Sequence, residues 1–293
     1  MLNFLPLKPG VQKYLQENNI EAYRLYNVGD NNVPLTIDIF KTDAVIHVLH
    51  PSVLEDLPEI EDDLRSALKI ENFFYKNRTK QNLELPVSPH KEMVIQEYGH
   101  KFLLNLSDYL DVGIFLDHRE TRQWIASQSK DKVVLNTFAY TGSFSVYAAN
   151  AGATKTYSVD LSKTYCDWIR KNLELNNLPL EQNWIYKMDT FEFFRYATRK
   201  NLKFDIIIID PPTFSKNKKN HFSVQKDHVE LLQQAANLLN PEGFILFSNN
   251  SQNFSLAKQK LQGLEITEKN DTIPPDFAGT KPHHCFILSN TLQ

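Results

Sequence analysis

The sequence predicts an α/β protein in two parts, an open and mostly parallel sheet preceded by a smaller α+β domain. Three observations lead to this prediction. From about residue 113, strand-like and helix-like segments alternate, which is typical of a parallel sheet with helices on its faces. Residues 204–209 contain four consecutive isoleucines, as expected of a strand that is covered on both sides. Residues 1–112 contain mainly short strands with alternating apolar side chains.

The first domain, residues 1–112, is predicted to contain few helices. Helical patterns occupy residues 11–15 and 58–68, and the second has Pro58 in its first turn. Strands are predicted at residues 22–26, 35–39, 44–48, 73–75, 93–98 and 101–106. Three cations, Lys76, Arg78 and Lys80, form a basic cluster in this domain. We interpret the domain as one that binds or positions a nucleic acid.

The second domain, residues 113–293, carries the strand–helix alternation. Helices are predicted at residues 121–129, 142–150, 191–198 and 229–239, together with one that places Tyr165, Trp168, Ile169 and Leu173 on a single face. Strands are predicted at residues 133–135, 156–159, 184–186, 204–209 and 244–247. Residues 263–268 and 284–288 are expected to form a closing pair of strands.

Composition excludes several classes of protein. The chain has 293 residues, a hydrophobic fraction of 42% and a formal net charge of −3, so nucleic acid would have to be bound by a local patch. The only cysteines are Cys166 and Cys285, which form no disulfide framework and no zinc-binding pair. We find no signal-peptide pattern and no apolar run of membrane-spanning length, and we therefore expect a soluble cytoplasmic protein. The sequence leaves its oligomeric state open.

Polar residues follow the predicted strands, where an open α/β sheet binds its ligands. A short polar turn ending at Gly142 follows the first strand, and Asp160 ends the second. Asp189 follows the third strand, residues 210–214 follow the fourth, and residues 248–250 follow the fifth. An acid such as Asp160 can bind the two hydroxyls of a ribose. Taken alone, each of these residues also fits an ordinary turn or strand end.

The cofactor that fits this Rossmann-like arrangement carries adenosine but no pyrophosphate. The glycine-rich loops that cradle phosphates are missing from the sequence. S-adenosylmethionine (SAM) has an adenine, a ribose, a sulfonium and an amino-acid end, but no phosphate. One glycine in the loop and one acid after the next strand match these chemical groups.

Residues 210–214, Asp-Pro-Pro-Thr-Phe, are the sharpest single signal. Two prolines fix the backbone and remove two N–H donors directly after a central strand. Such a rigid corner can hold a base beside a transferred methyl group, with Phe214 available for stacking. The alternative is a structural turn, which the position after a central strand makes less attractive.

These motifs resemble a large family of 23S ribosomal RNA methyltransferases. The shared motifs are Phe-Leu-Asp-His-Arg at residues 115–119, Asn-x-Phe-x-Tyr-Thr-Gly at 136–142 and Asp-Pro-Pro-x-Phe at 210–214. The similarity is nearest to the C-terminal, guanine-N7 half of the bifunctional RlmKL branch and runs nearly end to end. The other half of those enzymes, which modifies guanine N2, has no counterpart in this sequence, so that activity is not implied.

The resemblance implies a class I SAM-dependent methyltransferase sheet and a set of site residues. The cofactor-binding residues would be Phe115, Asp117, Arg119, Asn136, Phe138, Tyr140, Thr141, Gly142, Asp160, Leu161, Asp189 and Asp210. The loop over residues 115–119 would close over the cofactor. The residues that shape the acceptor pocket would be Asp210, Pro211, Pro212, Phe214 and Asn249.

The resemblance implies N7 of a guanine in 23S ribosomal RNA as the acceptor, and the residues fit this chemistry. N7 carries an in-plane lone pair and needs only alignment with the sulfonium methyl and exclusion of water. Cytosine C5 methylation needs a thiolate nucleophile, and Ser248, Asn249 and Asn250 occupy the expected position. An exocyclic amine of guanine or adenine is an alternative acceptor. A non-catalytic RNA-binding or assembly factor is the alternative from another class.

Histidines offer two further interpretations that the sequence does not favour. His118 could serve as a general base, but with Arg119 beside it we expect a loop-ordering or cofactor-contact role. His283, His284 and Cys285 suggest a metal site, yet neighbouring residues of a strand point to opposite faces. We therefore expect no metal. Lys216, Lys218 and Lys219 form a second basic cluster, which could bind phosphates near the target base.

Overall fold

The computed structural model describes residues 7, 10–28, 33–216 and 221–291. The chain divides into two compact units. Unit 1 comprises Met1–Leu116 and Pro274–Thr280, and unit 2 comprises Asp117–Ile273 and Lys281–Gln293. The first unit thus extends slightly beyond residue 112 and takes in a segment from near the C-terminus. Among the described residues, no helix is long and apolar enough to cross a membrane.

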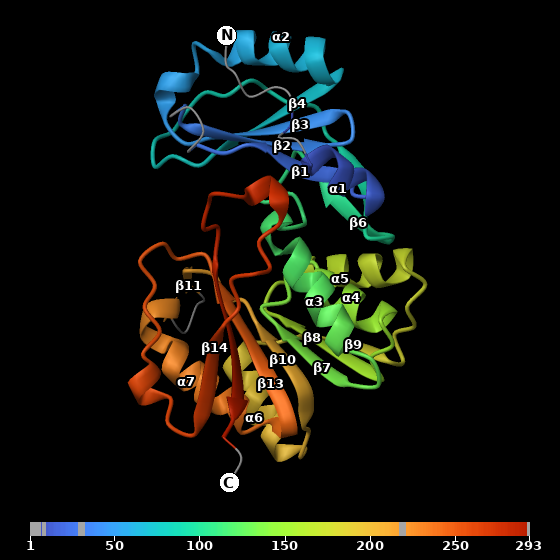
Figure 1. Cartoon of the computed structure of the whole chain (residues 1–293), viewed down its shortest axis with the longest axis vertical. Helices are drawn as coiled ribbons and strands as arrows, with labels where there is room; N and C mark the ends of the chain where they lie inside the picture. The colour runs from blue at the N-terminus through green and yellow to red at the C-terminus, as the bar shows by residue number, and fades with distance from the viewer. Residues whose placement is uncertain (1–6, 8–9, 29–32, 217–220, 292–293) are drawn as a thin grey trace. The chain divides into compact units, whose positions relative to one another are not determined.

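Unit 1 is built on a four-stranded sheet in the order β1-β2-β3-β4 (Figure 1). Its strands are β1 (Ala22–Tyr26), β2 (Leu35–Phe40), β3 (Asp43–Val48) and β4 (Asn72–Asn77). The first three strands are antiparallel, whereas β4 runs parallel to β3 after the connecting helix α2 (Leu57–Leu68). Helix α2 buries Leu57, Ile60 and Leu64 against the sheet, which confirms the predicted amphipathic helix.

Three smaller elements complete unit 1. Helix α1 spans Val11–Glu17, and strands β5 (Glu92–Glu97) and β6 (His100–Asn105) form an antiparallel hairpin. Tyr98 and Gly99 turn this hairpin with φ values of 51° and 80°, which are typical of a tight two-residue turn. In the returning segment, Phe277 is buried with the Arg24 guanidinium 4.8 Å from its ring centroid, and Asp276 accepts the Arg24 backbone N–H. These contacts explain why the segment belongs to unit 1.

Unit 2 contains a seven-stranded sheet in the order β14-β15-β13-β10-β7-β8-β9. Its strands are β7 (Val133–Thr137), β8 (Lys155–Asp160), β9 (Asn183–Lys187), β10 (Phe204–Ile209), β13 (Leu239–Asn249), β14 (Leu264–Glu268) and β15 (His284–Asn290). The five strands from β9 to β13 are parallel, and β15 is antiparallel to both of its neighbours. The chain builds β7, β8 and β9 in one direction and then crosses to β10. The strand order therefore reverses beside β7, where a ligand is expected.

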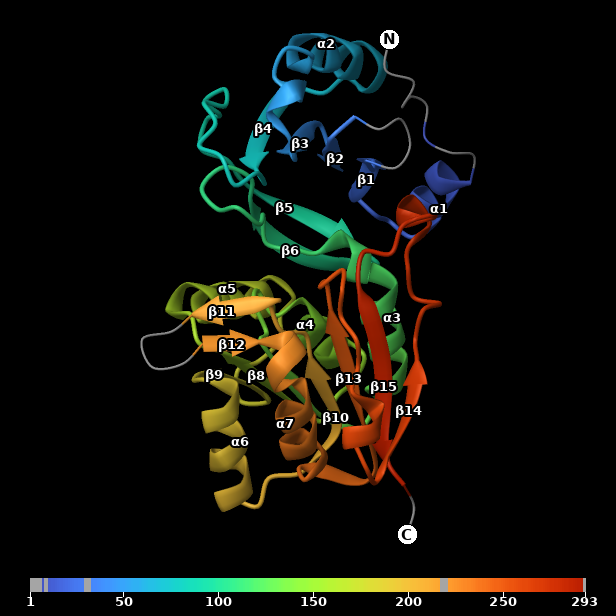
Figure 2. The same cartoon turned by 90° about the vertical axis from the view of Figure 1, so that its left-hand side faces the viewer.

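Helices cover both faces of the unit 2 sheet (Figures 1 and 2). On one face lie α3 (Arg119–Gln128), α4 (Ser143–Asn150) and α5 (Lys163–Leu175), and on the other lie α6 (Thr190–Arg199) and α7 (Val224–Ala236). Ile206 and Ile208 pack with Ile125 and Phe144. Ile207 and Ile209 belong to the core cluster on the opposite face, with side chains of α6 and α7. The isoleucine run is thus buried on both faces, as predicted.

Two local predictions about unit 2 are wrong. Helix α7 begins at Val224 and ends at Ala236, earlier than the predicted 229–239. Strand β13 begins at Leu239 rather than at the predicted residue 244, and its register against β10 shifts between Phe204 and Ile206, so Pro241 and Gly243 lie in a bulge. The sequence analysis also missed a short hairpin, β11 (Phe214–Lys216) and β12 (His221–Ser223), which leads into α7 (Figure 2).

Candidate functional site

The carboxyl ends of β7, β8 and β10 meet at one edge of the unit 2 sheet. Strand β7 pairs in parallel with β8 on one side and with β10 on the other. The turn ending at Gly142, Asp160 and Asp210 follow these three strands in that order. Parallel pairing places the residues that follow neighbouring strands at the same edge. The fold therefore gathers the three predicted loops in one region of unit 2.

The turn after β7 has an unusual backbone. Phe138 and Tyr140 both have a φ of 52°, and Gly142 has a φ of 80°. Positive φ is uncommon for bulky side chains and concentrates where a backbone is shaped for function. A Cβ atom added at Gly142 would lie 2.9 Å from Cγ2 of Ile169 in α5, so only glycine fits between this turn and that helix.

The Asp160 carboxylate ties this turn to the end of β8. Its Oδ2 accepts the Tyr140 backbone N–H at 2.9 Å, and its Oδ1 accepts the Ser162 backbone N–H at 2.8 Å. Burial raises the pKa of Asp160, and these backbone donors oppose the increase. A carboxylate offers about four acceptor positions, so Asp160 can also accept from a hydroxyl donor of a ligand. Leu161, the next residue, is 51% exposed at the same edge.

Two other predicted cofactor residues are buried and form hydrogen bonds inside the protein. The buried Asn136 side chain donates to the Ser145 hydroxyl at 2.9 Å. Thr141 is also buried, and its carbonyl oxygen accepts from Asn172 at 2.9 Å. The Asn136 side chain is thus bonded inside the protein, and the Thr141 carbonyl oxygen ties the turn to α5. The rings of Phe138 and Tyr140 are half-buried.

Asp189 begins helix α6 and serves as its N-cap. Its Oδ1 accepts the backbone N–H groups of Phe191 at 3.0 Å and Glu192 at 3.3 Å. The adjacent Met188 N–H donates to the Asp160 carbonyl oxygen at 3.0 Å. Asp189 therefore lies next to the end of β8, beside the other predicted cofactor residues, and its carboxylate also stabilises the helix start.

The corner after β10 is held by two hydrogen bonds, one from the end of β13 and one to Asn250, which directly follows that strand. The Ser248 hydroxyl donates to Asp210 Oδ1 at 2.6 Å, and the Thr213 hydroxyl bonds Asn250 Oδ1 at 2.9 Å. Pro211 is buried and Pro212 is exposed. Phe214 is 72% exposed, which is far outside the range expected of a core phenylalanine. The corner thus presents an aromatic ring to solvent from a fixed backbone.

Asn249, which we expect to contact the acceptor base, is instead fully buried. Its Oδ1 accepts the Ser251 backbone N–H at 3.1 Å, while its Nδ2 has no partner among the described residues. The strand-end pattern predicts the place of this side chain along the chain but not its direction. Asn250, the next residue, is the exposed one.

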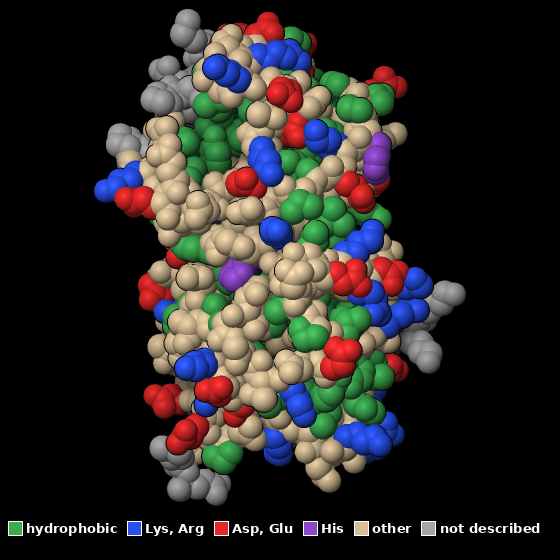
Figure 3. Space-filling model, turned by 90° about the vertical axis from the view of Figure 1, so that its right-hand side faces the viewer, with side chains coloured by type: hydrophobic (Ala, Val, Ile, Leu, Met, Phe, Trp, Pro, Cys, Tyr) green, Lys and Arg blue, Asp and Glu red, His purple; other side chains and the backbone are tan. Residues whose placement is uncertain are grey.

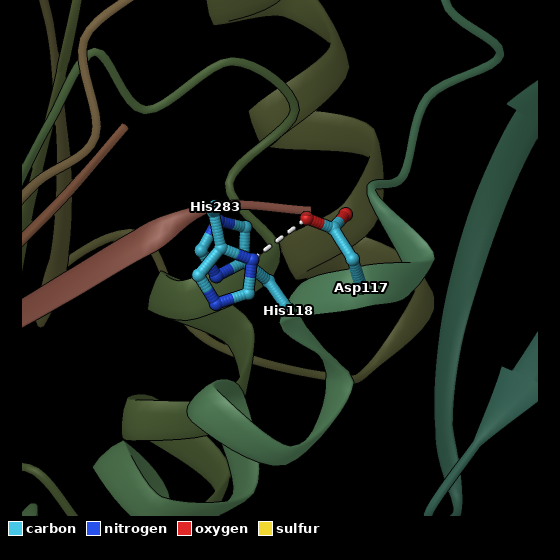
Figure 4. Close-up of side chains that lie close together, drawn as sticks. All are labelled: Asp117, His118 and His283. Carbon is cyan, nitrogen blue, oxygen red and sulfur yellow. Dashed lines mark hydrogen bonds and ion pairs between the residues drawn. The ribbon is translucent and has the colours of Figure 1, made fainter. Parts of the chain in front are cut away.

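The Phe-Leu-Asp-His-Arg motif divides between the two units. Phe115 belongs to unit 1 and is 38% exposed. Asp117 and His118 lie in a short 3-10 turn in unit 2, and Arg119 is fully buried at the start of α3. Asp117 Oδ2 is 2.8 Å from His283 Nδ1, and the His118 ring stacks on the His283 ring (Figure 4). His118 Nε2 is 3.6 Å from Asp210 Oδ2.

The sequence analysis named Ser248 only as a residue after the fifth strand and gave His283 no role, although both lie against predicted site residues. Strand β15 is antiparallel to β13, so its first residues lie beside the carboxyl end of β13, where His284 pairs with Asn249. His283 therefore reaches the ligand-binding edge although it is far from the other motifs in the sequence. The predicted closing pair of strands could have indicated the position of His283, because an antiparallel last strand begins at the ligand-binding edge of the sheet.

The basic cluster predicted in unit 1 does not form a free patch. Lys76 is buried, and its ammonium group donates to the carbonyl oxygens of Ser107 and Tyr109. Burial lowers the pKa of Lys76 to about 8. Arg78 pairs with Asp111 at 2.6 Å, so that only Lys80 of the three is exposed without such a role in the described structure. On the face drawn in Figure 3, Lys and Arg side chains are interspersed with Asp and Glu side chains.

The second basic cluster falls mostly outside the described residues. Lys218 and Lys219 are not among them, and of Lys216 only the backbone is described, as the last residue of β11.

Both cysteines are buried thiols. Burial raises the pKa of Cys166 to about 11 and that of Cys285 to about 12. At neutral pH both are protonated, so neither supplies a thiolate nucleophile. Cys285 lies in β15 opposite Ser248 rather than after β13.

Comparison with known proteins identifies the family of this chain. Residues 73–281 match the model of S-adenosylmethionine-dependent methyltransferases. The ribosomal RNA large subunit methyltransferase K of Neisseria meningitidis serogroup B is 34% identical, over 95% of this chain and 83% of that protein. The methyltransferase K/L of Pseudoalteromonas translucida is 38% identical over 94% of this chain but only 41% of that protein. The chain therefore spans about two fifths of the K/L relatives. The crystal structure of SMU.776 complexed with SAH aligns with a TM-score of 0.82 and 30% identity, covering 94% of this chain and 77% of that one.

Proposed function

The chain belongs to the family of S-adenosylmethionine-dependent methyltransferases, and from this premise we propose that it methylates N7 of a guanine in 23S ribosomal RNA. Relatives named ribosomal RNA large subunit methyltransferase K and K/L support an RNA substrate. The convergence of the loops after β7, β8 and β10 supports the cofactor position. The single observation that carries the proposal is the Tyr140–Asp160 hydrogen bond, which joins two of these loops.

The described residues fit the chemical groups of SAM. The Asp160 carboxylate would accept from the ribose hydroxyls in addition to its backbone donors. The turn leads directly into the N-terminus of α4 at Ser143, and a helix N-terminus suits a carboxylate, such as that of the amino-acid end. Asp189 would border the adenine from the start of α6. SAM itself supplies an activated methyl group on a positively charged sulfur.

The acceptor would be held by the corner after β10. Asp210 is fixed by Ser248, and the prolines that follow fix the backbone path to Phe214. The exposed Phe214 ring offers a stacking surface to an extruded base, and stacking is worth about 1–3 kcal/mol per base. Asn250 accepts from Thr213 through its Oδ1 and keeps its NH2 group, so we expect Asn250, rather than the buried Asn249, to donate to O6 of guanine and leave the N7 lone pair free.

Guanine N7 is an acceptor that requires no thiolate nucleophile from the protein. Its lone pair attacks directly, so the protein needs only to orient the base and exclude water. The protonated Cys166 and Cys285 argue against cytosine C5 chemistry, which needs a thiolate. We therefore place guanine N7 ahead of the other acceptors.

The test compares 23S ribosomal RNA from cells with and without the gene. Nucleoside mass spectrometry would identify the lost methylated base, and reductive chain cleavage reveals N7-methylguanine at one nucleotide. Loss of one such cleavage, restored by the purified protein with SAM, would support the proposal. Loss of an N2-methylguanine or N6-methyladenine would assign the exocyclic amine instead. No change in RNA together with no SAM binding by calorimetry would favour the non-catalytic binding factor.

A further inference from the structure

Two buried histidines form a face-to-face stack at the ligand-binding edge of unit 2 (Figure 4). The ring centroids of His118 and His283 are 3.9 Å apart with an interplanar angle of 19°. The His118 ring also meets the edge of Phe144 at 5.7 Å. Both histidine side chains are almost completely buried. The rings come from segments more than 160 residues apart in the sequence, so the stack joins the start of α3 to the start of β15.

Each ring is associated with a carboxylate. His283 Nδ1 is 2.8 Å from Asp117 Oδ2, so the proton on this nitrogen is donated to the carboxylate. His118 Nε2 is 3.6 Å from Asp210 Oδ2, which is beyond hydrogen-bond distance but favours a proton on Nε2. Asp210 Oδ1 is already held by Ser248. A continuous path therefore runs from Asp117 through the two rings to the corner after β10.

The other nitrogen of each ring is a buried acceptor without a partner among the described residues. These atoms are His118 Nδ1 and His283 Nε2. Unpaired buried polar atoms destabilise a fold and are uncommon unless they serve a function. A pair of apolar rings would fill the same volume without this cost. The histidines are thus better explained by a role at the site than by packing.

A shared metal ion does not explain the cluster. Asp117, His118 and His283 each offer a ligand atom, and these atoms lie within 4.8 Å of one another. An imidazole nitrogen binds an ion in the plane of its ring, and two nearly parallel stacked rings do not direct their lone pairs to one point. The Asp117 oxygen nearest the rings is also taken by His283.

We infer that His118 and His283 are positioning residues for methyl transfer, which hold the Asp210 carboxylate through a stack anchored on Asp117. The inference rests on the proposed function of the site. Ser248 fixes one oxygen of Asp210, and the small movement that brings His118 Nε2–H to the other oxygen would fix both. Burial lowers the pKa of His118 to about 4, and the nearby His283 contributes, so His118 is neutral at physiological pH. A neutral donor orients Asp210 without cancelling its negative charge.

The kinetic test uses His118→Phe, which keeps a ring in the stack but removes its nitrogens. Transfer is counted as labelled methyl incorporated from SAM into 23S ribosomal RNA of gene-deleted cells, whichever atom accepts it. We expect kcat to fall at least tenfold, with the KM and the calorimetric Kd for SAM within about twofold of wild type. His118→Gln, which retains a donor, should recover part of the loss, and His283→Phe should resemble His118→Phe. His284→Phe, at the adjacent residue where β15 begins, is the matched control.

Several outcomes would overturn the inference. An unchanged kcat in His118→Phe would remove His118 from any positioning role. A parallel loss of SAM affinity would make it a cofactor contact, and equal losses in His118→Phe and His118→Gln would indicate packing alone. Nitrogen NMR of histidine-labelled protein tests the geometry without activity, since His118 should be neutral with its proton on Nε2 and should respond to Asp210→Asn. A wild-type protein that transfers no methyl group would contradict the proposed function, whereas the NMR result judges the His118–Asp210 pair separately.

Discussion

The backbone N–H of Tyr140 donates to the carboxylate of Asp160 across 2.9 Å and so joins the turn after β7 to the end of β8. This hydrogen bond holds the strained turn in the conformation from which it would contact a ligand. It also occupies one oxygen of the residue that we expect to bind ribose. The same carboxylate therefore shapes the site and serves as part of it.

We predict that Asp160→Asn weakens SAM binding at least tenfold. The amide keeps one acceptor oxygen but presents an NH2 group to one of the two backbone donors, at Tyr140 or Ser162, and it offers fewer acceptor positions to the ribose. Calorimetric titration with SAM measures the change. Asp167→Asn is the control, because Asp167 lies on the exposed side of α5 and forms an ion pair with Lys163. Equal affinities for the Asp160 and Asp167 variants would show that Asp160 does not bind the cofactor.

We predict that Gly142→Ala destabilises unit 2 and lowers SAM affinity. Alanine is strained at a φ of 80°, and its Cβ would lie 2.9 Å from Ile169 Cγ2. The strain alone costs about 1 kcal/mol, and the contact with Ile169 should add to it. Gly263→Ala is a close control, since Gly263 has a φ of 81° but nothing within 4 Å of an added Cβ. Urea denaturation should show a larger loss for Gly142→Ala, and equal losses would disprove the steric part of the argument.

The sequence predicts the elements of unit 2 well because its strands are apolar on both faces and its helices are amphipathic. The Ile206–Ile209 run and the Trp168–Ile169 face each allow one secondary structure. Because the apolar strands are clear in the sequence, the acids at their ends, Asp160 and Asp210, are predicted as well. The sequence does not predict His283, because the antiparallel pairing of β15 with β13 brings that residue to the site only in three dimensions.

Side-chain direction is the other feature that the sequence leaves open. Asn249 and Asn250 are identical residues side by side, and only the structure shows which is buried. Lys76 likewise has the sequence context of a surface cation, yet its ammonium group satisfies two loop carbonyl groups inside unit 1. The charge of a residue is visible in a sequence, but its burial depends on contacts with Ser107 and Tyr109, about 30 residues away.

We predict that Lys76→Met lowers the stability of the protein by about 1–3 kcal/mol, since two buried carbonyl oxygens would lose their donor. RNA affinity and its salt dependence should stay near wild type, because the ammonium group does not face solvent. Lys80→Met, at an exposed position, should leave stability unchanged. Denaturation curves and RNA titrations at two salt concentrations distinguish the two roles. A lower salt slope in Lys76→Met at unchanged stability would restore Lys76 as a phosphate contact.

We predict that His118 makes the stability of the protein depend on pH between about 6.5 and 4. Burial lowers the pKa of folded His118 to about 4, with His283 and Arg122 acting in the same direction and Asp210 and Asp117 opposing them. The unfolded imidazole, with its pKa near 6.5, binds a proton in this window that the folded one does not. Stability therefore rises with pH through the window and is lost on acidification, by up to about 3 kcal/mol.

The measurement compares the wild type with His118→Phe, which cannot titrate. Urea denaturation at pH 7.5, 5.5 and 4.5 should show the wild type losing stability relative to the variant as the pH falls. The other buried histidines with lowered pKa values, His47 and His228, are present in both proteins and cancel in the difference. Parallel pH curves would show that His118 keeps an ordinary pKa or is accessible to water.

We predict that Phe214→Ala impairs methyl transfer to RNA without affecting the cofactor. The ring is 72% exposed, so its removal should change the free energy of unfolding by less than about 0.5 kcal/mol. Loss of stacking on the acceptor base, worth about 1–3 kcal/mol, should lower kcat/KM for RNA by roughly 5- to 150-fold. Phe214→Trp keeps a stacking surface and should retain most of the activity, and Val87→Ala, at a 99% exposed position of unit 1, is the surface control. If Phe214→Ala methylates RNA as well as the wild type does, the corner after β10 does not present its aromatic ring to the substrate.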